Sequence, residues 1–96
     1  MRVEIDVAIV GSGVAALAAA LKLADEKSVL ILTKDKGPST NSAMAQGGIA
    51  AVTDSKDSFE SHVHDTLVAG AGLCKIEAVR NIIEQAPERI KDLTDW

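Results

Sequence analysis

The chain opens with an apolar segment that runs through Gly-Ser-Gly directly into an alanine-rich stretch, and residues 5–16 read IDVAIVGSGVAA. Gly11 lets the backbone turn tightly out of a strand, and Gly13 has no side chain, so a diphosphate can approach the main chain. Ala16 is small at the point where the helix packs on the strand. The first turn of such a helix offers unpaired N–H groups and a partial positive charge to phosphates. This pattern predicts a dinucleotide-binding turn.

The residues around the glycines predict a parallel strand–helix–strand unit with a right-handed crossover. Residues 3–10 are nearly continuously apolar, which is typical of a parallel strand covered on both faces. Residues 14–24 are rich in alanine and carry only Lys22 as a charge, so a mostly buried helix is expected there. Residues 28–32 form the second strand. A tight turn that binds no ligand is the alternative, but two glycines destabilise a helix start, which favours the binding interpretation.

A long polar connection follows over residues 33–46. It exceeds an ordinary connection in a compact domain, and loops of this length are usually functional or disordered. Gly47-Gly48 then leads into residues 49–52, which are predicted to form a short apolar strand.

Helices are predicted for the rest of the chain. Asp57, with Glu60 three residues later, has the pattern of a helix N-cap. Helical spacing places four residues of this helix on one face: Phe59, Val63, Leu67 and Gly70. A further helix is expected over residues 75–86, and Pro87 is expected to end it and to begin a fourth.

Composition narrows the class of protein. The 96 residues suffice for one small domain, and the net charge of −4 comes from interspersed acids and bases, with no basic stripe for nucleic acid. A single cysteine, Cys74, excludes an internal disulfide framework and suits a reducing compartment. No signal peptide or membrane span is evident, so we expect a soluble, cytoplasmic protein. The apolar spacing up to Trp96 has no helix cap, so we expect the front part of a longer protein.

Other chemistry-bearing residues have modest interpretations. His62 with Asp65 and Thr66 can form a hydrogen-bonded set, although a histidine at the edge of the core is favoured. His62 and His64 are two residues apart and point away from each other on a helix, which disfavours a metal pair. Cys74 has no basic activator, so an inert buried thiol is favoured. We therefore expect no catalytic residue and no metal ligand in this chain.

The end of the second strand distinguishes between cofactors. An acid there binds ribose hydroxyls, whereas a base suits a 2′-phosphate. The sequence Thr33-Lys34-Asp35-Lys36 leaves NADP open, because Asp35 is as consistent with a solvated loop charge as with a ribose ligand.

Two longer segments carry a family resemblance over essentially the whole chain. Residues 41–52, NSAMAQGGIAAV, resemble a segment of the succinate dehydrogenase and fumarate reductase flavoprotein family. Residues 61–74, SHVHDTLVAGAGLC, are similar to the L-aspartate oxidase branch of that family, which shares the Ala-Gly-Ala-Gly-Leu run. The resemblance implies an α/β fold, namely the N-terminal part of a Rossmann-like FAD-binding domain in which helices follow the parallel strand–helix–strand unit.

The resemblance also implies FAD rather than a nicotinamide cofactor. Thr33-Lys34 would lie near the adenosine end, and Gln46 would offer its amide to the flavin ring. Respiratory relatives link flavin covalently through a histidine at the position of Asn41, and an amide cannot form that bond, so non-covalent FAD is expected. The expected cofactor-binding residues are Gly11, Ser12, Gly13, Val14, Ala15, Ala16, Thr33, Lys34, Ser42, Ala43, Met44, Ala45, Gln46, Gly47 and Gly48.

The implied activity is oxidation of L-aspartate to iminoaspartate, the first step of NAD biosynthesis, with oxygen or fumarate as acceptor and hand-off of the product to quinolinate synthase. The rest of the domain, the substrate-capping domain and the catalytic residues are expected beyond residue 96. Alternatives are a fumarate reductase or succinate dehydrogenase flavoprotein subunit, and a nucleotide-binding fragment without catalytic activity.

Overall fold

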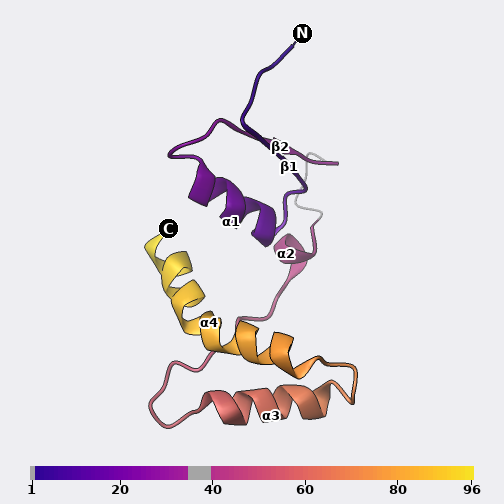
Figure 1. Cartoon of the computed structure of the whole chain (residues 1–96), viewed down its shortest axis with the longest axis vertical. Helices are drawn as coiled ribbons and strands as arrows, with labels where there is room; N and C mark the ends of the chain where they lie inside the picture. Colours follow the sequence, from indigo (N-terminus) through magenta and orange to yellow (C-terminus); the bar gives the residue numbers. More distant parts are fainter. Residues whose placement is uncertain (1, 35–39) are drawn as a thin grey trace. The chain divides into compact units, whose positions relative to one another are not determined.

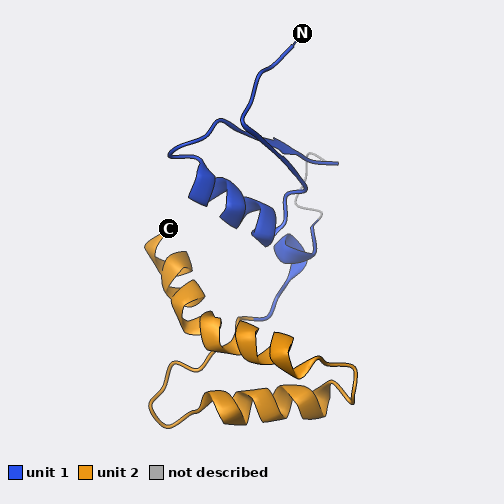
Figure 2. Ribbon diagram, viewed as in Figure 1, with its two compact units in different colours: residues 1–47 blue, residues 48–96 orange. Residues whose placement is uncertain are grey.

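The computed structural model describes residues 2–34 and 40–96, and it divides into two compact units, residues 1–47 and 48–96 (Figure 2). The first unit contains β1 (Val7–Val10), α1 (Val14–Leu23), β2 (Val29–Leu32) and the short α2 (Asn41–Met44). The second contains α3 (Phe59–Ala69) and α4 (Ile76–Asp95) (Figure 1). Asp35, the possible ribose ligand, lies outside the described residues.

The parallel strand–helix–strand unit predicted from the sequence is confirmed. β1 and β2 pair in parallel, with Val7 opposite Val29 and Val10 opposite Leu32. Both strands are shorter than predicted, because regular pairing begins at Val7 and Val29. Figure 1 shows α1 along one side of this strand pair.

The expected burial of this unit is wrong. Neither strand is covered on both faces, since Val10 is 84% exposed and alternate residues of β1 and β2 are open to solvent. α1 contains no buried residue, and its Leu21 is 52% exposed. Two strands and one helix can cover only one another, so the outer faces of both stay exposed within this unit.

Asp6 and Ser28 join the starts of the two strands through several hydrogen bonds. The Ser28 backbone N–H and hydroxyl both donate to Asp6 Oδ2 at 2.8 Å, and the Asp6 N–H donates to Ser28 Oγ at 3.0 Å. The hydrogen bonds from the Ser28 backbone and then its side chain lower the pKa of Asp6 below its ordinary value. These hydrogen bonds therefore join the two chain segments directly before the regular strand pairing begins.

The lowered pKa of Asp6 predicts a pH-dependent contribution to stability. Because the unfolded chain binds a proton more readily than the folded one, the contribution is complete above the unfolded pKa and is lost as the pH falls through the lower folded pKa. Asp6→Asn should therefore destabilise the chain near neutral pH and have little effect in acid well below the ordinary aspartate pKa. Urea unfolding of both proteins at the two pH values measures this. An equal loss at both would show that the carboxylate charge contributes nothing.

The second unit consists of two helices packed through a small core. Val63 of α3 is 3% exposed and Ile83 of α4 is 5% exposed. Arg80 of α4 adds a two-pronged ion pair with Glu60 of α3, in which Arg80 Nη2 donates to Glu60 Oε2 at 3.0 Å. The hydrogen bonds and charge of Arg80 lower the pKa of Glu60. The pair is exposed, so the apolar contact contributes more to stability.

Several helix and strand boundaries differ from prediction. Ser58, not Asp57, is the N-cap of α3, and its Oγ accepts from the Ser61 N–H at 3.1 Å. Residues 49–52 form no strand, because a strand needs a pairing partner and the structure pairs only β1 with β2 among the described residues. The connection over residues 33–46 contains α2.

Pro87 does not end a helix. α4 continues through it to Asp95, so the predicted third and fourth helices are one. The proline ring lacks an N–H, which removes one hydrogen bond of the helix and favours a bend. Figure 1 shows α4 changing direction about midway along its length.

The turn between α3 and α4 is tightly packed at Gly70, the C-cap of α3. A Cβ at Gly70 would overlap Cys74 Sγ and lie 3.2 Å from the Thr66 carbonyl oxygen. Gly70→Ala should lower the free energy of unfolding by about 1–3 kcal/mol through overpacking. Chemical denaturation of this variant, and of Gly70→Ala combined with Cys74→Ala, tests the cause. The double variant should recover most of the loss, and no recovery would place the strain elsewhere.

Candidate functional site

The glycine turn lies at the carboxyl end of β1, as the sequence predicted. Gly11 has φ +114°, a backbone conformation that side-chain-bearing residues rarely adopt, and its N–H donates to the Leu32 carbonyl at 2.8 Å. Gly13 is the N-cap of α1 and supplies no side-chain hydrogen bond to the helix. The N–H groups of the first helical turn therefore depend on partners from outside the helix.

The end of β2 is tied to this turn. Ser12 Oγ and Thr33 Oγ1 lie 3.1 Å apart and share a hydrogen bond. Parallel pairing explains the contact, because the carboxyl ends of neighbouring parallel strands lie at the same edge. The turn and the start of the long connection thus meet where a doubly wound fold places its ligand.

A segment distant in sequence reaches the same place. Ser42 in α2 accepts a hydrogen bond from the Val14 N–H at 3.1 Å. Thr40 holds α2 in shape, since its Oγ1 accepts from the Ala43 N–H at 3.1 Å. The structure therefore brings together three parts of the predicted site: residues 11–16, Thr33 and Ser42.

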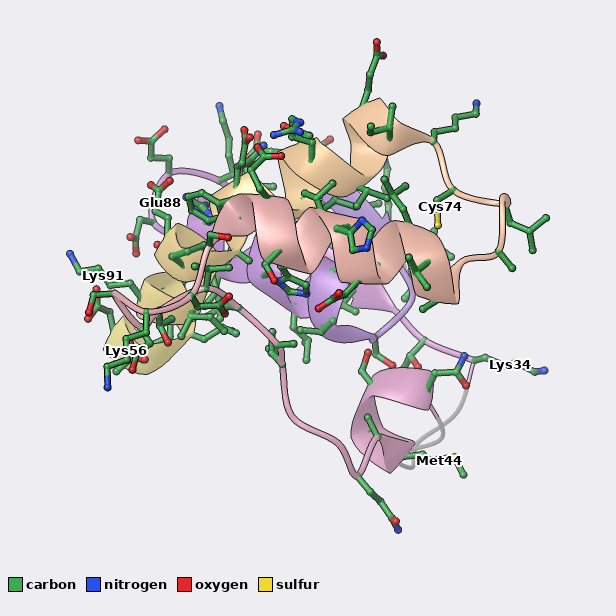
Figure 3. The ribbon with its side chains drawn as sticks, turned by 90° about the horizontal axis from the view of Figure 1, so that it is seen from below. Lys34, Met44, Lys56, Cys74, Glu88 and Lys91 are labelled. Carbon is green, nitrogen blue, oxygen red and sulfur yellow. The ribbon has the colours of Figure 1, made fainter. Side chains whose placement is uncertain are left out.

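The side chains of two other predicted site residues do not point toward this cluster. Figure 3 shows Lys34 and Met44 pointing away from the ribbon, and Met44 is 70% exposed. Ala43, Ala45, Gln46 and Gly47 are also exposed, in the same stretch of chain. Gly48 is exposed as well and is the first residue of the second unit.

The helix start suits an anion. α1 has no acidic residue in its first turn and has Lys22 in its last, so the helix itself places no carboxylate at the positive end of its dipole. A Cβ at Gly13 would lie 3.4 Å from Ser42 Oγ, so the glycine leaves room beside the helix start. Open backbone, helix N–H groups and hydroxyl side chains fit the diphosphate of a dinucleotide.

The second unit has a separate cavity of about 290 Å³, lined by Ile49, Ala50, Ala51, Asp57, His62 and Asp65. The hydrogen-bonded set proposed for His62, Asp65 and Thr66 takes another form, because the Thr66 hydroxyl donates to the His62 backbone carbonyl at 2.8 Å. His64 is exposed and Cys74 is half-buried. No local sequence pattern indicates this cavity, since residues 49–51 and residues of α3 line it together.

Two searches of the described residues found nothing further. Residues 2–34 and 40–96 hold no group of three or more His, Cys, Asp or Glu side chains placed to bind a metal ion. Within the same residues, no helix combines the length and apolar character that a membrane crossing needs.

A parallel strand–helix–strand unit whose glycine turn meets the helix N-terminus defines a dinucleotide-binding protein. Residues 6–96 match the FAD binding domain family, and the chain belongs to that family. The cofactor of the family is FAD, which confirms the prediction made from the resemblance and decides against NADP.

Several proteins similar to this chain are L-aspartate oxidases. L-aspartate oxidase 1 of Ralstonia nicotianae is 54% identical over 90% of this chain and 16% of that relative. L-aspartate oxidase of Vibrio cholerae is 50% identical over 96% of the chain and 17% of the relative. The chloroplastic enzyme of Arabidopsis thaliana is 48% identical over 92% of the chain and 14% of the relative. The predicted resemblance to this branch is confirmed, and the chain spans about a sixth of the length of these relatives.

A solved structure supports the fold. A mutant of E. coli quinol fumarate reductase FrdA matches with a TM-score of 0.83 and 35% identity, over 96% of this chain and 16% of that one. The expected partial Rossmann-like FAD-binding fold is thereby confirmed.

Proposed function

We propose that this chain forms the diphosphate-binding part of an FAD-dependent L-aspartate oxidase. The observation that carries the proposal is the turn from β1 into α1. Gly11 has φ +114° in this turn, and the chain passes from it directly into the N-terminus of α1. The identities of 48–54% to three L-aspartate oxidases support the choice of enzyme. The remainder of the FAD-binding domain and a substrate-capping domain would complete the protein.

Three parts of the chain would hold different parts of the cofactor. Residues 11–16 would surround the diphosphate, and Thr33 with Lys34 would lie toward the adenosine. Residues 42–48 would follow the cofactor toward the flavin, where small side chains let backbone N–H groups approach. When bound, FAD supplies the hydride acceptor for oxidation of L-aspartate to iminoaspartate, with oxygen or fumarate as the final acceptor. This chain contributes binding and orientation, and no catalytic residue is assigned within it.

Asn41 predicts that FAD is held without a covalent bond. It is the first residue of α2, and a carboxamide does not form the histidine–flavin link expected at this position in respiratory relatives. Acid denaturation and filtration of the flavin-loaded protein should release essentially all of the yellow colour into the filtrate. Flavin that stays with the precipitated protein would contradict this prediction.

Substrate choice separates the proposed enzyme from its alternative. The similarity to fumarate reductase at 35% identity favours a succinate dehydrogenase or fumarate reductase subunit as the second candidate. Anaerobic mixing of the intact flavin-loaded protein with L-aspartate should bleach the flavin absorbance, whereas succinate should not. Bleaching by succinate alone would favour the succinate dehydrogenase or fumarate reductase subunit over L-aspartate oxidase. Bleaching by neither substrate would favour a nucleotide-binding fragment without catalysis.

The same proposal covers location and partners. We place the reaction in the cytoplasm, although the Arabidopsis relative is chloroplastic. L-aspartate and oxygen or fumarate would be the small-molecule reactants, and the iminoaspartate would pass to quinolinate synthase. Neither nucleic acid nor a membrane is part of the proposed activity.

A further inference from the structure

We draw no further inference here: the strongest candidate, the cavity of the second unit where the side chains of Asp57, His62 and Asp65 lie beside residues 49–51, is a cluster of two carboxylates and an imidazole, and nothing in the structure shows what covers it.

Discussion

Gly11→Val is expected to weaken FAD binding by roughly fivefold to a hundredfold, since a strained backbone residue costs on the order of 1–3 kcal/mol and 1.4 kcal/mol is a factor of ten. Gly11 has φ +114°, which a β-branched residue cannot adopt without strain. A Cβ built on Gly11 meets no atom within 4 Å, so backbone conformation and not crowding is the reason for glycine here. The turn should relax away from this conformation and move the helix N–H groups off the diphosphate. Fluorescence titration with FAD measures the effect.

Gly72→Val is the matched control for Gly11→Val. Gly72 also has a positive φ, +87°, but it lies in the turn between α3 and α4, in the other unit. It should reduce stability by a similar amount and leave the Kd for FAD close to that of the wild type in the folded protein. If both variants weakened FAD binding equally, general destabilisation would explain the loss, and the glycine turn would lose its assigned role.

Ile83→Ala is expected to lower the free energy of unfolding by about 2–4 kcal/mol, as is usual when a large buried side chain is truncated. Ile83 and Val63 are the buried hydrophobic residues among those described, so they form the centre of the contact between α3 and α4. A unit of this size buries little surface, and such a loss is a large fraction of its stability. Urea unfolding followed by circular dichroism at the helix band measures it.

Ile82→Ala provides the comparison for Ile83→Ala. Ile82 is the next residue back along α4 and is 68% exposed, so its truncation should cost less than about 0.5 kcal/mol. Both substitutions place alanine in a helix, and so the difference between them reports burial alone. Equal losses would mean that α4 packs through a different face from the one seen here.

Local patterns predicted much of the fold. The two strands, α1 and α3 follow from apolar runs, alanine content and helical spacing, and each of these signals depends on neighbours within a few residues. Predictions failed where neighbours distant in sequence decide the outcome. Residues 49–52 are apolar enough for a strand, but a strand needs a pairing partner, and among the described residues only β1 and β2 pair. Pro87 was expected to end a helix, but it removes only one hydrogen bond of α4, which continues on both sides of it.

For the candidate site, the sequence by itself determined the glycine turn, the identity of the residues around it and the resemblance that led to FAD. These are properties of short segments, because φ at Gly11 and the dipole of α1 depend on the chain immediately around them. Only the tertiary structure decided that Ser42 meets Val14, that Ser12 meets Thr33, and that Lys34 and Met44 point outward. Contacts between residues 21 and 28 positions apart depend on how the strands pair and how the connection returns, and no local spacing encodes that path.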